Sequence, residues 1–257
     1  MVATSRKIVI GDVHGQYDAL MQLFGAIAPS ANDQVCFVGD LIDRGPKSAH
    51  VVDFVMHSPY ECLLGNHEKM LLDLLPEGPQ QQQILHSWIM SGGQATLLSY
   101  QDLFHEPGIP SNHIDWLLER PLYQDWGDYW LVHAGVDPTL PVEEQTAQQC
   151  CWIRDPFHAS STPYFEDKTI VTGHTITFTL PGIEPGELVQ GQGWIGIDTG
   201  AYHPRSGWLT ALDLSNQMVY QVNVYESQSR VLPLRDIIRR VNPAQISDRA
   251  ARMATFS

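Results

Sequence analysis

The sequence is poor in basic side chains. Its 257 residues contain 15 Lys and Arg against 29 Asp and Glu, which gives a formal net charge of −14. An acidic surface repels phosphate backbones, so we expect no nucleic-acid partner. The charge is uneven, because residues 226–257 hold six Arg against three acids. We interpret residues 1–225 as the main domain and 226–257 as a basic segment, with one amphipathic helix from Leu234 that closes at Pro243.

Two further features are absent. The four cysteines (Cys36, Cys62, Cys150 and Cys151) form no Cys-x-x-Cys pair, which disfavours a structural zinc site. We predict that Cys36 and Cys62 are buried thiols, because both lie in apolar runs. No apolar run approaches the ~20 residues that a membrane span needs, and residues 1–7 lack the apolar stretch of a signal peptide. We therefore expect a cytoplasmic protein without a membrane partner.

What the sequence does contain is a recurring pattern: a short apolar run, a turn, and then a polar residue that can bind metal. Such runs are typical of buried strands, and the helical patterns Tyr17–Ile27 and Ser48–Met56 lie between the first three. Alternating strands and helices predict an α/β fold with loops gathered at the strand ends. Residues 69–121 are mostly helical in pattern and predict an insertion beside the site. The runs and the residues that follow them are Lys7–Ile10 before Asp12, Gln34–Val38 before Asp40, Glu61–Leu64 before Asn66, Trp130–Val132 before His133, Thr169–Thr172 before His174, and Trp194–Ile197 before Asp198.

Most of these polar residues are of types that bind metal ions. Asp12 and His14 are two apart on an extended segment, so they point the same way and can hold one ion. Asp40 can offer one oxygen to each of two ions, which suits an ion pair roughly 3.5–4 Å apart. Oxygens and imidazoles at one kind of location predict a metal centre of Asp12, His14, Asp40, Asn66, His133 and His174.

Taken singly, each motif has a plainer interpretation. Asp43 and Arg44 fit a surface ion pair in a turn, and Asn66 fits a helix cap. Against this, Arg44 presents a planar fork that matches a phosphate edge. His67 points away from Asn66 and is free to donate a proton. Asp198 is either a partner of a ligating histidine or part of a turn, and both interpretations stay open.

The order of the motifs resembles the PPP-type protein phosphatases of the calcineurin-like metallophosphoesterase superfamily, closest to their small bacterial branch. The motifs are Gly-Asp-Val-His-Gly at 11–15, Gly-Asp-Leu-Ile-Asp-Arg-Gly at 39–45, Gly-Asn-His-Glu at 65–68, and then His133 and His174. The resemblance implies a central β-sandwich flanked by helices, with a dinuclear site at the strand ends. Asp12, His14 and Asp40 would hold one ion, and Asp40, Asn66, His133 and His174 the other.

The resemblance also implies the remaining roles in the site. Arg44, Arg154 and Asn66 would bind the phosphate, and His67 would be the catalytic acid, oriented by Asp43. An ion pair between Arg154 and Asp155 is the plainer alternative for that arginine. The ions would be two divalent cations, with Mn²⁺ expected and Fe or Zn as alternatives, because these ligand types accept all three.

The implied function is a metal-dependent serine/threonine protein phosphatase, with phosphotyrosine as an alternative target. It would hydrolyse phosphate monoesters of a protein, a peptide or a small molecule by direct attack of a metal-bridging hydroxide. One alternative is a symmetrical dinucleoside-polyphosphate hydrolase, a class that tends to lack the acid at Asp43 and to have Asp in place of Glu68. Both positions therefore favour the phosphatase. The other alternative, a non-catalytic scaffold, is disfavoured by the complete ligand set. The sequence leaves the oligomeric state open.

Overall fold

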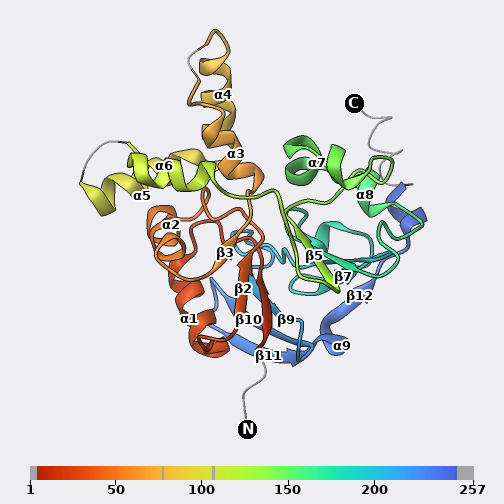
Figure 1. Cartoon of the computed structure of the whole chain (residues 1–257). Helices are drawn as coiled ribbons and strands as arrows, with labels where there is room; N and C mark the ends of the chain where they lie inside the picture. The colour runs from red at the N-terminus through yellow and green to blue at the C-terminus, as the bar shows by residue number, and fades with distance from the viewer. Residues whose placement is uncertain (1–4, 77, 106–107, 248–257) are drawn as a thin grey trace.

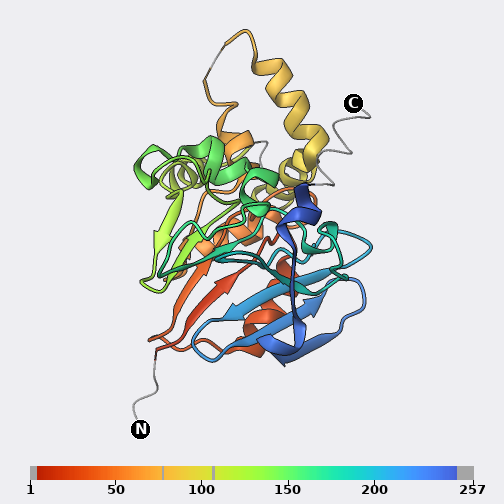
Figure 2. The same ribbon diagram turned by 90° about the vertical axis from the view of Figure 1, so that its right-hand side faces the viewer.

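The chain folds into two six-stranded β-sheets that face each other. The computed structural model describes residues 5–76, 78–105 and 108–247. Helices α1 and α2 cover one sheet, and α7 and α8 lie over the other (Figures 1 and 2). The helices are α1 (Tyr17–Ile27), α2 (Ser48–Met56), α3 (Asn66–Leu72), α4 (Gln81–Trp88), α5 (Gln94–Phe104), α6 (Ser111–Leu118), α7 (Ala147–Trp152), α8 (Asp155–His158) and α9 (Leu234–Ile237), with short turns η1 (Ile89–Gly93), η2 (Val142–Glu144) and η3 (Thr177–Thr179).

The first sheet has the strand order β11-β10-β9-β1-β2-β3, and the second has the order β12-β7-β8-β6-β5-β4. In the first sheet, β1, β2 and β3 are parallel; in the second, β5, β6 and β8 are parallel. The strands are β1 (Lys7–Ile10), β2 (Gln34–Phe37), β3 (Glu61–Cys62), β4 (Tyr123–Asp125), β5 (Tyr129–Val132), β6 (Thr169–Thr172), β7 (Leu188–Gln190), β8 (Trp194–Gly196), β9 (Trp208–Asp213), β10 (Met218–Asn223), β11 (Ser229–Pro233) and β12 (Ile238–Arg240).

The central residues of the parallel strands are mostly apolar because both faces of these strands are covered. Ile8 and Ile10 of β1 pack with Leu20 of α1 on the helix side of the first sheet. Val9, which points to the opposite face, packs with Val171 of the second sheet. A strand buried on both sides has no position left for a polar side chain, so its sequence is a continuous apolar run.

The outer face of the second sheet is also covered. Trp130 of β5 and Trp194 of β8 pack there with Cys150 of α7 and Phe157 of α8. The result is a helix–sheet–sheet–helix arrangement with apolar contacts between each pair of layers. The predicted fold class, a β-sandwich flanked by helices, is confirmed.

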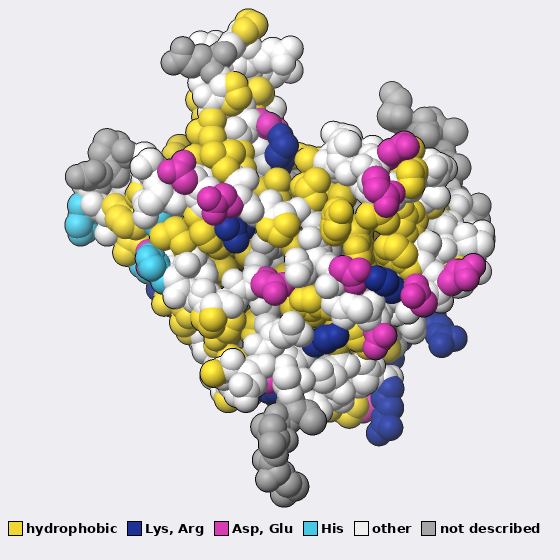
Figure 3. Space-filling model, in the orientation of Figure 1, with side chains coloured by type: hydrophobic (Ala, Val, Ile, Leu, Met, Phe, Trp, Pro, Cys, Tyr) yellow, Lys and Arg dark blue, Asp and Glu magenta, His cyan; other side chains and the backbone are white. Residues whose placement is uncertain are grey.

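Within the stretch expected to be a helical insertion, the structure has α4, η1, α5 and α6. Helix α4 projects from the rest of the molecule, and apolar side chains are visible along this projection (Figures 1 and 3). Met90 of η1 is 74% exposed. At Gly92 the backbone of η1 adopts a φ of +116°, which turns the chain from α4 into α5. This turn brings α5 back against α2.

The expected helix from Leu234 to Pro243 was a wrong prediction. The helix α9 ends at Ile237, and the next residues form β12, which pairs in parallel with β7. Leu234 and Ile237 are buried as the helical pattern required, but the hydrogen bonds of the sheet replace the helix after one turn. Residues 248–257 of the predicted C-terminal segment lie outside the described residues.

All four cysteines are free and buried, as we predicted for Cys36 and Cys62. Burial raises the pKa of both of those thiols well above its usual value, which makes them inert packing groups. None of the helices in the described part of the chain combines the length and apolar composition of a membrane span.

Candidate metal centre

Polar residues from both sheets meet at one edge of the sandwich. Strands β1, β2, β5 and β6 end just before Asp12, Asp40, His133 and His174, and α3 begins at Asn66 after β3. All of these side chains are buried, and so is His14. The carboxyl ends of parallel strands share one edge of their sheet, so ligands placed after each strand converge. The structure thus brings together the six residues predicted from sequence, four from the first sheet and two from the second.

His14 and Asp40 form the core of the first half of the centre. The Nδ1–H of His14 donates to the carbonyl of Ile42 at 2.9 Å, which leaves Nε2 facing Oδ2 of Asp40 at 3.5 Å. Ligand atoms of His14, Asp40 and His67 lie within 4.8 Å of one another. Asp12, which we expected in this group, instead accepts the backbone N–H of His174 at 3.0 Å.

The second half of the centre surrounds the amide oxygen of Asn66. This oxygen lies 3.0 Å from Nε2 of His133 and 2.7 Å from Nδ1 of His174. The Nδ1–H of His133 donates to the carbonyl of Val38 at 2.8 Å, which fixes the ring. Helix α3 has Gly65 as its N-cap, so Asn66 does not act as the cap. Its amide is directed into the centre instead.

Asp40 is common to both halves. Its Oδ1 lies 3.4 Å from Nε2 of His133, while its Oδ2 faces His14. Ligand atoms of Asp40, His133 and His174 also lie within 4.8 Å of one another. A carboxylate with one oxygen toward each group is the arrangement that a bridging ligand requires.

Charge and protonation in the centre suit divalent cations. Burial lowers the pKa of His14 and His174, which keeps the imidazoles neutral and able to bind metal. Burial raises the pKa of Asp12 well above its usual value, and the charges of Asp198 and Asp40 raise it further. Buried carboxylates that repel one another are stabilised by a cation placed among them. His174 Nε2 is buried and has no hydrogen-bond partner among the described residues. The donor set therefore fits the divalent ions of the Mn, Fe and Zn type.

The backbone around the centre is unusual. His14, Asp40, Asp43, Arg44 and His174 all have positive φ values, between +47° and +71°. Side chains other than glycine adopt this left-handed region infrequently, although Asp and His do so more readily than most. In this centre the strained backbone lies in the loops that follow β1, β2 and β6, which contain the candidate ligands.

Two arginines and His67 line a cavity of about 120 Å³ next to the ligands, together with Tyr202. Arg44 Nη1 lies 3.1 Å from Nε2 of His14, and its guanidinium stacks over the Tyr202 ring at 4.0 Å. Arg154 donates to the hydroxyl of Thr175 at 3.0 Å. Among the described contacts Arg154 forms no ion pair with Asp155, so the plainer alternative for this residue is not realised.

His67 is held in the orientation that a proton donor needs. Its Nδ1–H donates to Oδ2 of Asp43 at 2.6 Å, and its Nε2 faces into the centre, 3.9 Å from Oδ2 of Asp40. Burial lowers the pKa of His67, but Asp40 and Asp43 together outweigh it and leave a net increase. The ring is therefore charged more readily than a histidine in water.

Glu68 has a role that sequence reasoning missed. Its carboxylate accepts the backbone N–H groups of Asp40 at 2.9 Å, Leu41 at 2.7 Å, Ile42 at 3.2 Å and Gly65 at 3.1 Å. It thereby joins the turn after β2 to the start of α3. The signal for it in the sequence was a glutamate three residues after a helix-capping Gly, a known pattern at helix starts.

Asp198 was left open between two interpretations, and the structure favours the turn. Its carboxylate accepts the backbone N–H of Gly200 at 2.9 Å. No hydrogen bond to a histidine is present in the described contacts of this residue. Burial, with a contribution from Asp40, raises the pKa of Asp198 to about 6.

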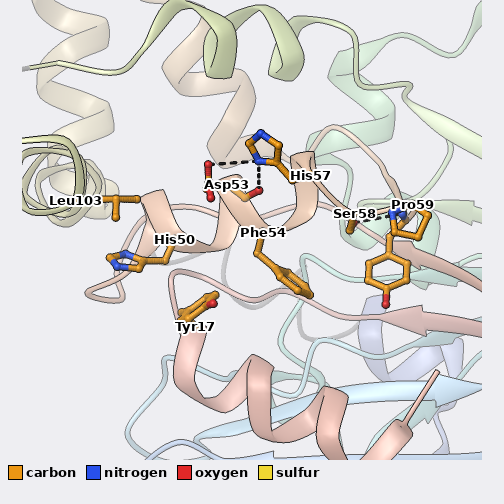
Figure 4. Close-up of a pocket in the computed structure, with 9 residues that line it drawn as sticks. Tyr17, His50, Asp53, Phe54, His57, Ser58, Pro59 and Leu103 are labelled. Carbon is orange, nitrogen blue, oxygen red and sulfur yellow. Dashed lines mark hydrogen bonds and ion pairs between the residues drawn. The ribbon is translucent and has the colours of Figure 1, made fainter. Parts of the chain in front are cut away.

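A larger pocket, of about 460 Å³, lies beside α1 and α2 (Figure 4). Tyr17, Phe54 and Tyr60 give it aromatic walls, and Asp53 and His57 lie on one face of α2. Asp53 and His57 form an exposed ion pair one helical turn apart, a common surface arrangement. None of the predicted ligands lines this pocket, so the smaller cavity is the one where the chemistry can occur.

Comparison with known proteins finds curated relatives that are not named protein phosphatases. A relative from Dechloromonas aromatica (strain RCB), named symmetrical bis(5'-nucleosyl)-tetraphosphatase, is 35% identical over 132 residues, or 50% of this chain and 43% of the relative. The chain spans about half the length of the curated relatives it matches.

Solved structures show the same fold. A crystal structure of a candidate diadenosine tetraphosphatase has a TM-score of 0.60 at 21% identity and covers 90% of this chain and 95% of that one. A cold-active protein-tyrosine phosphatase from a psychrophilic Shewanella species has a TM-score of 0.54 at 20% identity and covers 89% of this chain and 80% of that one.

The prediction of a serine/threonine protein phosphatase, acting on a phosphorylated protein or peptide, was wrong. The curated relatives carry the tetraphosphatase name that we had ranked second. The error came from Asp43 and Glu68, which neither line the small cavity nor face a substrate. Asp43 orients the His67 ring, and Glu68 holds the backbone of the turn after β2. Since neither residue lines the cavity, the identity of these two residues says little about the substrate.

The family itself is shown by the sequence. The model of the calcineurin-like phosphoesterases matches residues 5–178, which is most of the chain and includes all six candidate ligands. The two-sheet fold and the cluster of aspartate, asparagine and histidine at its edge agree with that match. This chain belongs to the calcineurin-like phosphoesterase family and is a metallophosphoesterase.

Proposed function

We propose that this protein hydrolyses dinucleoside polyphosphates symmetrically, with diadenosine tetraphosphate as the representative substrate. The observation that carries the proposal is a complete ligand set beside a row of aromatic and cationic side chains, of which Arg44 and Tyr202 line the small cavity. The tetraphosphatase name of the curated relatives supports the same substrate class. We further propose that residues 1–225 form the catalytic domain, with the insertion at 69–121 beside the site and 226–257 as a C-terminal segment.

The row begins at Arg44 and leads away from the metal ligands. Tyr202 lies under the Arg44 guanidinium, and its ring centroid is 6.1 Å from that of His203. Phe178 follows, 4.9 Å from His203, with the Arg205 guanidinium 4.8 Å from the Phe178 ring. A phosphomonoester would occupy only the Arg44 end. A substrate with several phosphates and an aromatic base can use the two arginines and the partly exposed rings of Tyr202 and His203, because arginines bind phosphate and rings stack on bases. Phe178 is buried and supports His203 and Arg205.

Arg205 is free to serve an extended substrate. Its side chain is exposed, and within the described part of the chain no carboxylate forms an ion pair with it. His203 lies near both Arg205 and Arg44, since burial, Arg205 and Arg44 all lower its pKa. In a chain with a net charge of −14, these arginines provide local positive potential for an anionic substrate.

We propose two divalent ions for the centre. Asp12, His14 and Asp40 would hold one, and Asp40, Asn66, His133 and His174 the other, with Mn²⁺ as the expected metal. When bound, such ions neutralise charge on phosphate oxygens and lower the pKa of water. The chain's own residues position the substrate and donate a proton to the departing oxygen.

Arg44, Arg154 and the Asn66 amide are proposed to bind the oxygens of the phosphoryl group under attack. Both arginines line the cavity, and their hydrogen bonds strengthen as negative charge grows on those oxygens. Water loses a proton to the solvent and adds to phosphorus, and the bond to the bridging oxygen of the central anhydride breaks. His67 then gives its Nε2 proton to the departing oxygen while Asp43 keeps the ring aligned. The two products are nucleoside diphosphates.

The test is product analysis with the purified protein and Mn²⁺. Diadenosine tetraphosphate should yield two molecules of ADP, which anion-exchange chromatography separates from the AMP and ATP of asymmetric cleavage. A phosphoserine peptide and p-nitrophenyl phosphate are assayed in parallel. A kcat/KM on the peptide equal to or above that on the tetraphosphate would contradict the proposal.

The row itself can be tested with Arg205→Gln. We expect the KM for diadenosine tetraphosphate to rise about tenfold, the loss of one charge-assisted hydrogen bond to phosphate. The KM for p-nitrophenyl phosphate should not change, because that substrate does not reach Arg205. Arg235→Gln, at an exposed side chain of α9, is the matched control and should change neither value.

A further inference from the structure

The carboxylate of Asp43 is held by more than His67. Trp88 Nε1–H donates to Oδ2 at 2.9 Å, and the hydroxyl of Thr96 donates to Oδ1 at 2.6 Å. The Asp43 carboxylate and the Trp88 and Thr96 side chains are buried. Every oxygen of the carboxylate therefore has a donor other than His67, and these donors restrict rotation of the side chain.

Both of these donors come from the inserted helices. Trp88 ends α4 and Thr96 lies in the first turn of α5, so the two flank η1. Neither residue lines the small cavity or belongs to a ligand group. Trp88 lies in the stretch 69–121 that the sequence predicts as helical, and no local motif marks it as part of a site.

The bend at η1, between α4 and α5, leaves little space around Trp88 and Arg44. A Cβ added at Gly93 would lie 2.4 Å from ring atoms of Trp88, and one added at Gly92 would lie 2.7 Å from Cγ of Arg44. The carbonyl of Gly92 also accepts the backbone N–H of Arg44 at 3.2 Å. The insertion thus contacts Asp43 and Arg44 together, through residues that do not line the small cavity.

We propose that Trp88 and Thr96 are positioning residues that act through Asp43 on His67, which makes the inserted helices part of the machinery for proton transfer. The inference rests on the proposed role of His67. Asp43 has a left-handed backbone with φ +71°, so its side chain is not held by a regular element. The two donors supply the missing restraint, and the aligned carboxylate in turn aligns the imidazole.

A purely structural role is the competing explanation, and a double-mutant cycle separates the two. Thr96→Val removes the hydroxyl at nearly constant shape, Thr96→Ser restores it, and Trp88→Phe removes the indole N–H. Each change is made in the wild-type chain and in an Asp43→Ala chain. Tyr100→Phe is the control, because Tyr100 is fully buried in the same helix and its hydroxyl contacts His113 rather than Asp43. Values of kcat and KM are measured on diadenosine tetraphosphate and on p-nitrophenyl phosphate, with circular dichroism as the check on folding.

We expect Thr96→Val and Trp88→Phe each to lower kcat about tenfold, as is typical for residues that orient an active group, while KM changes less than twofold. Thr96→Ser should recover most of the lost kcat. In the Asp43→Ala chain, Thr96→Val should change kcat less than twofold, because the group through which it acts is gone.

Equal losses from Thr96→Val in both backgrounds would overturn the inference, and so would a loss from Tyr100→Phe as large as that from Thr96→Val. If Asp43→Ala does not fold, the comparison of Thr96→Val with Thr96→Ser and Tyr100→Phe decides. Failure of the proposed substrate would appear differently, as wild-type protein that cleaves p-nitrophenyl phosphate but not the tetraphosphate. In that case the cycle is measured on the phosphoserine peptide, whose alkoxide leaving group needs a proton from His67, and it still tests Trp88 and Thr96.

Discussion

Oδ1 of Asp40 lies 3.4 Å from Nε2 of His133, although the two residues follow strands in different sheets. Neither sheet alone contains the centre. An ion held by both residues would connect the sheets, and such an ion binds the folded chain but not the unfolded one. Its binding free energy therefore adds to the stability of the fold.

Metal removal should affect activity and stability together. We expect chelation followed by dialysis to abolish hydrolysis and to lower the unfolding temperature, and Mn²⁺ to restore both. The measurements are turnover and thermal unfolding on the same samples, with metal content determined by mass spectrometry. Full activity in a sample shown to be free of metal would contradict the assignment of the centre.

His67→Asn should separate metal binding from proton transfer. We expect unchanged metal content and a loss of turnover of roughly 10²–10⁴-fold on an ester with a poor leaving group, which is the usual contribution of a general acid. The loss should be smaller on p-nitrophenyl phosphate, whose leaving group needs little protonation. Equal losses on both substrates would exclude His67 as the acid. His86→Asn, at an exposed position of α4, serves as the control.

Glu68→Gln should destabilise the fold. The carboxylate accepts four backbone N–H groups with its two oxygens, and the amide nitrogen of glutamine accepts none. Leaving buried donors unpaired should lower the free energy of unfolding by about 1–3 kcal/mol for each donor. Urea denaturation of the metal-free protein measures the change, and Glu184→Gln, at an exposed site, gives the reference. A free energy equal to that of the reference variant would show that Glu68 does not hold the turn.

Buried His158 should make the fold sensitive to acid. Burial, helped by Arg154, lowers the pKa of His158 to about 3 from an ordinary value of 6.5. Below pH 6.5 the His158 imidazole binds a proton in the unfolded chain, whereas in the folded chain it stays neutral until about pH 3. The stability from neutral His158 is therefore complete above pH 6.5 and decreases as the pH falls toward 3.

The variant His158→Phe isolates this effect, because a phenyl ring can replace the imidazole against Trp194. Between pH 6 and 4, the wild-type chain should lose up to about 1.4 kcal/mol of unfolding free energy per pH unit more than the variant. Chemical denaturation at several pH values checks this. Parallel pH curves for the two proteins would show that His158 titrates normally in the folded state.

The ligands were predictable from sequence because their signal is local. Each follows an apolar run by a few residues, and the parallel strands then carry them to one edge. The helices Tyr17–Ile27 and Ser48–Met56 were predicted with the bounds that the structure shows, since both have an apolar face of helical period.

Other features were not predictable because they depend on contacts between distant segments. Thr96 forms a hydrogen bond with Asp43, which lies 53 positions earlier in the chain, and no local sequence pattern predicts this contact. Residues 238–240 have a helical pattern, yet pairing with β7 makes them a strand. The substrate class was misjudged for a related reason, because Asp43 and Glu68 are fixed by partners behind the site. The residue types at these two positions reflect the hydrogen bonds that fix the loops, and they do not report the substrate.

The left-handed backbone at Asp43 and Arg44 has a consequence for how this chain could change over time. Such conformations cost on the order of 1–3 kcal/mol each in residues other than glycine. Glycine would adopt them without strain, but it would remove the guanidinium or the carboxylate. Selection for heat resistance would therefore favour glycine at Asp43 and Arg44, which belong to the site. Each gain in heat resistance made there would come with a loss of turnover.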